Sequence, residues 1–197
     1  MPQIRFRLPT GIPFYPNRYI SHWLIGFSVL ITISFYALTF ILSPVSSNLV
    51  EYFALQRMPI RPETLIYILS QISLYQFLHG DILHLFLNAY FLYQAWPEVE
   101  TRMKRREFLL FFFGNTFFVA TALWFLSSSP TIGISGFCMA LLSYLYMNLQ
   151  ATRNPMANQV LIMLLINVGL GLFGNISFVG HAAGAVFGIM WWIWRRR

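Results

Sequence analysis

Apolar residues form long runs along this chain, and charged residues gather between the runs. The first run, residues 20–42, has 23 residues and contains no Asp, Glu, Lys or Arg. As a helix it would reach about 34 Å, which is enough to cross a hydrocarbon core of about 30 Å. Further apolar runs occupy residues 82–96, 108–126, 133–149, 156–173 and 179–194. The pattern predicts an all-α bundle of six transmembrane helices.

The segment 43–81 departs from this pattern. Charged residues are scattered among its apolar ones, and Pro59 and Pro62 interrupt any long helix. We predict a large first loop with short amphipathic helices that lie in the membrane interface. Residues 64–80 are uncharged and resemble a further span, so the choice between six and seven spans depends on the loop charges.

The second and sixth runs are short for membrane spans. Fifteen residues of helix cover only about 23 Å of the roughly 30 Å core. Short spans predict local thinning of the bilayer or a water-filled dip at one face, and either would suit a hydrolytic site.

Composition supports a membrane protein. The chain is 57% hydrophobic and only 10% charged, whereas soluble domains carry about a quarter charged residues. The single cysteine excludes an internal disulfide. We expect one membrane domain over residues 1–197, with residues 1–19 as a short basic leader, no cleaved signal and no soluble N-terminal domain.

The basic residues predict the orientation. Eleven of the 13 Lys and Arg residues fall before the first run, between the second and third, between the fourth and fifth, or at the C-terminus. By the positive-inside rule these regions, and both termini, are cytoplasmic. If residues 64–80 also crossed the membrane, most of these charges would lie outside, so we prefer six spans. The net charge of +7 is thereby explained by topology, and we expect no nucleic-acid partner.

Four polar residues share one depth in this arrangement. His84 and Asn88 lie in the first two turns of the second span, Ser135 in the first turn of the fourth, and His181 in the first turn of the sixth. All three spans would enter from the outer side. Polar groups inside a membrane are costly and usually face the bundle interior, where they often mark function.

Two stripes of small residues indicate how these spans meet. Glycines recur every four residues at 180, 184 and 188, and small residues recur at 136, 140 and 143. Such stripes let helix backbones approach closely. Simple helix packing would explain the glycines alone, but close approach is also what a Ser–His hydrogen bond of about 2.6–3.2 Å requires. No acidic residue lies inside a predicted span, so we expect a Ser135–His181 dyad without a third carboxylate.

Three motifs together resemble the rhomboid intramembrane serine proteases of the bacterial GlpG type. They are Gly-Ile-Ser-Gly at 133–136, Gly-His-Ala-Ala-Gly at 180–184 and His-Leu-Phe-Leu-Asn at 84–88. Six spans and a long first loop also match. Two departures are the absence of a Trp-Arg pair in the first loop and Met139 at a position where many members carry Tyr.

The resemblance implies roles for these residues. Ser135 would be the nucleophile and His181 the general base of a peptidase that cuts transmembrane proteins near the outer face of the bacterial inner membrane. His84, Asn88, the Ser135 backbone N–H and the loop shaped by Gly133 would form the oxyanion hole. The fifth span and the loop around residues 174–178 would form the substrate gate and cap, and Glu100 would hold a structural acidic position.

Other interpretations remain open. A chaperone or adaptor on the same fold would bind transmembrane segments without cutting them, whereas a transporter lacks support because we find no inverted repeat. We expect no cofactor and no metal, because His79 and His84 are five residues apart and would face different sides of a helix. Cys138 reads as an inert buried residue. The sequence does not give the substrate or the oligomeric state.

Overall fold

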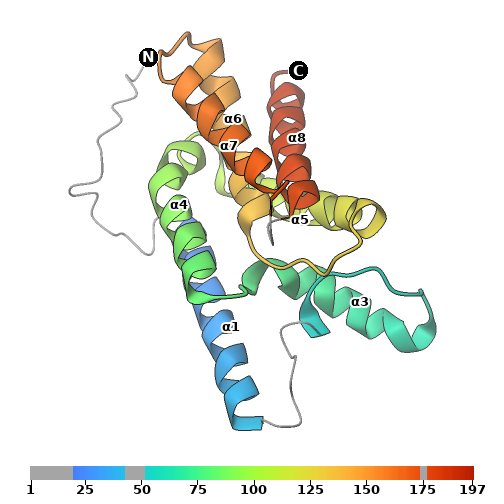
Figure 1. Cartoon of the computed structure of the whole chain (residues 1–197). Coiled ribbons are helices and arrows are strands. Elements are labelled where there is room, and N and C mark those ends of the chain that lie inside the picture. Colours follow the sequence, from blue (N-terminus) through green and yellow to red (C-terminus); the bar gives the residue numbers. More distant parts are fainter. Residues whose placement is uncertain (1–19, 43–51, 174–176) are drawn as a thin grey trace.

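The computed structural model describes residues 20–42, 52–173 and 177–197. The regular elements in these ranges are all helical (Figure 1). They are α1 (Ile20–Leu42), α3 (Pro62–Leu74), the 3-10 helix η1 (Tyr75–Phe77), α4 (Ile82–Glu100), α5 (Arg105–Leu126), α6 (Ser135–Ala151), α7 (Ala157–Leu170) and α8 (Phe178–Arg195). The basic leader 1–19 and residues 174–176, the first part of the predicted cap, lie outside the described residues.

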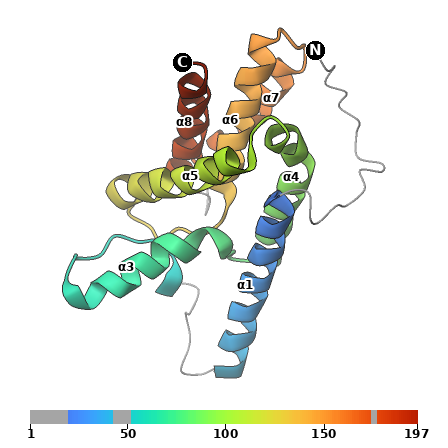
Figure 2. The ribbon, with the colours of Figure 1, turned by 180° about the vertical axis from the view of Figure 1, so that it is seen from behind.

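Helix α6 forms the centre of the molecule. It contacts α4, α5, α7 and α8, and every residue from Gly136 to Leu145 is buried. A helix that is buried on all sides belongs to the core of a bundle. Figures 1 and 2 show α6, α7 and α8 side by side, with α1 packed along α4 and α3 lying away from the three C-terminal helices.

Local side-chain chemistry explains where several helices begin. The Asp81 carboxylate accepts a hydrogen bond from the backbone N–H of His84 at 2.7 Å and so caps α4. Ser177 caps α8 by accepting from the N–H of Gly180 at 3.1 Å. Pro62 occupies the first turn of α3, where its missing N–H costs nothing.

The helix bounds confirm some predictions and correct others. α1 covers the predicted residues 20–42. α4 has 19 residues and α8 has 18, so both helices are longer than the predicted runs, although at about 28 and 27 Å they remain slightly shorter than a core of about 30 Å. Tertiary contacts extend α4: Val99 is fully buried, and the Glu100 carboxylate accepts from the backbone N–H of Ile20. α7, with 14 residues, is shorter than predicted.

In the described part of the first loop, residues 52–81, the structure contains the short helices α3 and η1, as the prediction of short helices requires. α3 has 13 residues and would extend about 20 Å. A β-bridge joins this loop to the segment before α6, since Leu55 and Thr131 exchange backbone hydrogen bonds of 2.9 and 3.0 Å. The first loop therefore supports the chain that leads to Ser135.

The surface is rich in large apolar side chains. Phe40 is 87% exposed, Phe125 69% and Leu165 60%, which is the expected exterior of a helix bundle in lipid. By length and composition, one described helix, Arg105–Leu126, could span a membrane, while His22–Leu38 and Ala157–Leu170 are shorter apolar helices.

The C-terminal end of α8 is joined to three other parts of the bundle. The Arg195 guanidinium forms an ion pair with Glu107 at the start of α5. It also donates to the Tyr144 hydroxyl on α6 and to the backbone carbonyl of Arg102 in the α4–α5 connection. These contacts close the end of the bundle at which α5 begins and α8 ends.

Candidate active site

Helices α6 and α8 touch through their backbones. A Cβ atom built on Gly184 would lie 1.9 Å from the Gly136 carbonyl oxygen, and one on Gly188 would lie 2.0 Å from that of Ala140. No side chain fits in such a space, so glycine is required at both positions of α8. The two predicted stripes of small residues do face each other, and this prediction is confirmed.

Ser135 is the first residue of α6 and is half-buried. Two residues earlier, Gly133 adopts φ +109°, a conformation that residues with a side chain rarely adopt. The backbone N–H of Gly133 donates to the Tyr75 carbonyl at 2.9 Å. Together with the Leu55–Thr131 bridge, this bond fixes the turn that presents Ser135 at the start of the helix.

His181 lies in the first turn of α8 and is buried, with 6% of its surface exposed. Its Nδ1 atom lies 2.7 Å from the backbone carbonyl oxygen of Asn167 on α7. A carbonyl only accepts hydrogen bonds, so Nδ1 carries a proton, and in the neutral ring Nε2 keeps its lone pair. This is the tautomer that a general base acting through Nε2 requires.

The structure places the turns of Ser135 and His181 against each other without a direct bond between them. A Cβ atom on Gly136, the residue after Ser135, would lie 3.1 Å from the carbonyl oxygen of Gly180, the residue before His181. Within the described part of the chain, no hydrogen bond joins the Ser135 hydroxyl to the imidazole. Catalytic hydrogen bonds are often long without substrate and shorten in the reacting complex.

Helix α4 borders the same turn. A Cβ atom on Gly133 would lie 2.8 Å from Cε1 of the His84 ring, so that ring rests on the loop before Ser135. One turn further, the Asn88 Nδ2 atom donates to the His84 carbonyl at 3.1 Å. Its Oδ1 atom accepts from the Cys138 thiol at 3.6 Å. His84 thus contacts the loop before α6, and Asn88 contacts the first turn of α6.

His79 also reaches this region, which the sequence did not indicate. The expectation that His79 and His84 face different sides of one helix was wrong, because His79 precedes α4 and the two ring centroids lie 4.9 Å apart. Burial, with a smaller effect from His84, lowers the pKa of His79 to about 4, so His79 is neutral at pH 7. Among the described residues, no group of three or more His, Cys, Asp or Glu could hold a metal ion.

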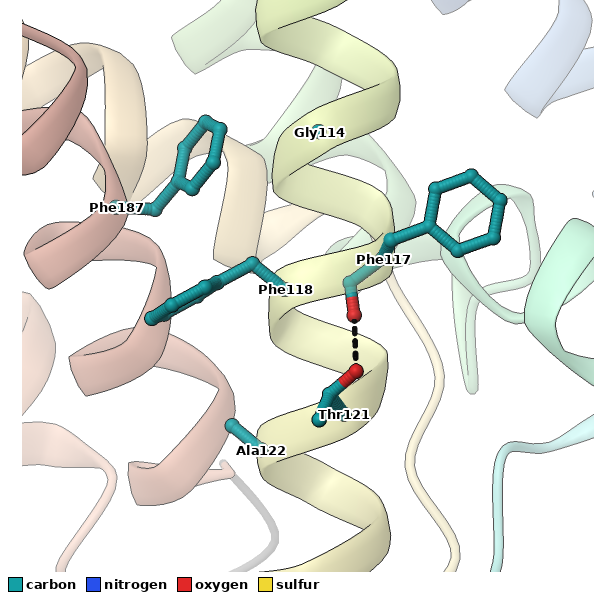
Figure 3. Close-up of a pocket in the computed structure, with 6 residues that line it drawn as sticks. All are labelled: Gly114, Phe117, Phe118, Thr121, Ala122 and Phe187. Carbon is teal, nitrogen blue, oxygen red and sulfur yellow. Dashed lines mark hydrogen bonds between the residues drawn. The ribbon is translucent and has the colours of Figure 1, made fainter. Parts of the chain in front are cut away.

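A groove between α5 and α8 lies apart from these residues (Figure 3). Its lining is Gly114, Phe117, Phe118, Thr121, Ala122 and Phe187. The one hydroxyl there, on Thr121, donates to the Phe117 carbonyl of its own helix at 2.8 Å. The groove is apolar and contains none of the predicted site residues, so it offers no group for catalysis.

The helix bundle, its apolar exterior and the polar residues at the start of α4, α6 and α8 define a helical membrane protein. A model of the Rhomboid domain matches residues 67–197, which include every predicted site residue. The chain therefore belongs to the rhomboid family, whose members are generally intramembrane serine proteases. No curated protein matches the chain.

Proposed function

We propose that this protein is an intramembrane serine endopeptidase that hydrolyses peptide bonds in or near transmembrane segments of other proteins. The observation that carries the proposal is the backbone contact between α6 and α8, which brings the turn of Ser135 against the turn of His181. The His181 tautomer supports the same assignment, because a protonated Nδ1 leaves Nε2 as the basic atom.

The reaction follows from these two groups. His181 Nε2 takes the proton of the Ser135 hydroxyl as its oxygen attacks the substrate carbonyl, and then passes that proton to the leaving amine. Water, activated by the same imidazole, hydrolyses the acyl-enzyme and restores the serine. Since α6, α7 and α8 contain no Asp or Glu, the pair works without an acidic third member.

The oxyanion of the tetrahedral intermediate needs fixed donors. The backbone N–H of Ser135 is among the free N–H groups at the start of α6, where the helix dipole favours negative charge. The His84 ring and the Asn88 amide lie beside the same turn. We assign these three donors to the oxyanion hole, with Gly133 shaping the loop between them.

The proposed topology has six spans, α1 and α4 to α8, within a single membrane domain. The basic residues favour cytoplasmic N- and C-termini. The site, at the opposite end of α8 from the arginines, would then lie near the outer face. With the motif resemblance, this arrangement favours a bacterial protease of the GlpG type in the inner membrane, acting on transmembrane protein substrates in the bilayer.

A test must separate a protease from a non-catalytic rhomboid protein that only binds transmembrane segments. The missing Ser135–His181 hydrogen bond is the observation that favours this alternative. We expect a fluorophosphonate to label purified protein at Ser135, and the protein to cleave a single-span substrate in proteoliposomes. Ser135→Ala and His181→Ala should each abolish cleavage while the protein stays folded, and the double variant should lose no more, because the two residues act as one unit.

Two results would overturn the assignment. Absence of both labelling and cleavage across a panel of single-span substrates would favour the binding protein. Substantial cleavage by Ser135→Ala would remove the serine from its role and direct attention to Cys138, three residues along the same helix.

A further inference from the structure

The last turn of α7 leaves a carbonyl group without a helical partner. α7 ends at Leu170, and the carbonyls of a final helical turn have no N–H group ahead of them in the helix. The Gly171 N–H, which would normally bond to the Asn167 carbonyl, bonds instead to that of Val168 at 3.1 Å. The Asn167 carbonyl oxygen accepts from His181 Nδ1 at 2.7 Å.

This bond has the chemistry that a carboxylate supplies in a serine–histidine–aspartate triad. The acceptor fixes the ring orientation and the tautomer, and it stabilises the imidazolium that forms when Nε2 takes a proton. The C-terminus of a helix carries about half a negative charge, so a carbonyl there is a better partner for a cation than an ordinary peptide carbonyl.

We propose that the C-terminal end of α7 takes the place of the missing acidic residue. The Asn167 carbonyl is the positioning group for His181, and Gly171 sets the distance between α7 and α8. The inference rests on the proposed function of Ser135 and His181. The further claim is that the basicity of His181 depends on the position of the C-terminal end of α7 relative to α8.

The contact at Gly171 explains how the distance is set. A Cβ atom on Gly171 would lie 2.5 Å from Cα and 2.7 Å from the backbone nitrogen of Phe178, the first residue of α8. Gly171 has φ −64°, which any residue can adopt. The contact, and not the backbone angle, therefore excludes a side chain. Because both atoms of Phe178 are backbone, an added methyl must push the end of α7 away from α8.

The rest of α7 offers little resistance to such a shift. Its buried residues are Ala157, Val160 and Leu164, and none lies in the last turn. Moving this turn would withdraw the Asn167 carbonyl from His181 while leaving the α6–α8 contact at Gly136 and Gly184 in place. The serine and the base would stay together, but the base would lose its acceptor.

The first experiment compares Gly171→Ala with Gly169→Ala, a matched control on the same turn with no atom within 4 Å of its added Cβ. The readouts are the labelling rate of Ser135 by a small fluorophosphonate, and kcat and KM for a transmembrane substrate. For Gly171→Ala we expect labelling and kcat to fall together by about tenfold to a hundredfold, with KM unchanged. Gly169→Ala should stay within about twofold of the parent.

A second experiment changes the acceptor without touching any side chain, in case Gly171→Ala does not fold. Incorporating the α-hydroxy acid of valine at position 168 turns the Asn167–Val168 amide into an ester, whose carbonyl is a weaker acceptor. The same change at Ile166 removes a comparable helical N–H but leaves the Asn167 carbonyl intact. We expect the ester at 168 to slow labelling by about threefold to tenfold relative to the ester at 166.

The outcomes separate the two proposals. If the parent protein is labelled and Gly171→Ala or the ester at 168 reacts as fast as its control, the role of α7 is overturned and the protease assignment stands. A rise in KM with unchanged labelling would show that α7 affects only substrate entry, and this too would overturn the role. If the parent protein is neither labelled nor active, the protease assignment fails and the role of α7 fails with it.

Discussion

His181 and Asn88 in the proposed site are each held by hydrogen bonds and each keep one further hydrogen-bonding position for chemistry. His181 is held at Nδ1 by a carbonyl and keeps Nε2. Asn88 is held on both sides: Nδ2 faces the His84 carbonyl and Oδ1 faces the Cys138 thiol. A flipped amide would bring two oxygens together, so these contacts fix its orientation. The second hydrogen on Nδ2 is then available to a substrate oxyanion, which is the preorganisation that catalysis needs.

We predict that His84→Ala and Asn88→Ala each lower kcat by about 10²–10³, or roughly 3–4 kcal/mol, with little change in KM. Donors to an oxyanion act mainly in the transition state, and each can partly cover for the other. Fluorophosphonate labelling of Ser135 should persist at a lower rate, since the dyad remains. If Asn88→Ala changed only KM, α4 would have a role in packing but none in the oxyanion hole.

At this scale the sequence points to candidate side chains but not to backbone groups. Hydroxyl, imidazole and amide groups are unusual in apolar spans. The sequence could therefore identify four candidate site residues: Ser135, His181, His84 and Asn88. The contact between the Asn167 carbonyl and His181 could not be predicted, because every residue has a carbonyl and only the end of α7 makes this one available. Cys138 is buried as predicted, but its contact with Asn88 depends on how α4 meets α6.

Among the elements, α6 and α8 form the contact on which the site depends. Their stripes of small residues replace side chains with direct backbone packing. In lipid, where apolar side chains gain little by leaving their surroundings, such close packing is a main source of helix association. The residues that align the proposed catalytic groups are therefore also those that hold the two helices together.

We predict that Gly184→Ala destabilises the protein by about 1–3 kcal/mol and abolishes most activity. Its Cβ would lie 1.9 Å from the Gly136 carbonyl oxygen, so α6 and α8 must separate. Gly26→Ala on α1 is the control, because nothing lies within 4 Å of its added Cβ. Thermal unfolding in detergent and cleavage assays measure both effects. Equal melting temperatures for the two variants would contradict the packing described for α8.

Helix positions were predictable from the apolar runs, whereas their ends and some of their faces were not. α4 continues to Glu100 because that end packs against the start of α1, a tertiary effect that no local pattern encodes. The apolar run 20–42 predicts a plain apolar span, yet α1 has polar contacts along one side. Thr32 donates to the Phe77 carbonyl at 3.0 Å and Tyr36 donates to that of Gly80, so α1 holds the segment before α4.

At the scale of the whole molecule, orientation is the property that the loop charges predict. Thr152→Cys should react with a membrane-impermeant maleimide only from the cytoplasm, and Ser128→Cys only from outside. Both positions are exposed, and native Cys138 is buried and gives little background. Thr152 is preferred to Arg153, whose φ of 51° would strain a substitute. Reversed labelling would mean that the first loop crosses the membrane and that the site faces the cytoplasm.

Which helices pack against one another could not be predicted from the sequence. Apolar spans resemble one another, so their pattern cannot say that α6 is central or that α5 packs against α8. From the sequence, Arg195 is only one of the basic residues that predict the topology. Its ion pair with Glu107 shows that one of these basic residues also joins helices, which a count of loop charges cannot reveal.

Arg195 joins the end of α8 to α5 through an ion pair with Glu107. Changing the ionic strength should therefore change the stability of the protein without changing its catalytic rate. The Arg195–Glu107 pair is partly exposed, so dissolved salt screens it. His181 lies about 21 Å away along α8, and its site is held by neutral hydrogen bonds and backbone contacts. Raising the salt concentration should therefore lower the melting temperature of the parent protein more than that of Arg195→Gln. In both proteins kcat, measured well below the melting temperature, should hardly change. The reason is that salt weakens the ion pair at the C-terminal end of α8 but not the neutral contacts around His181 at its other end.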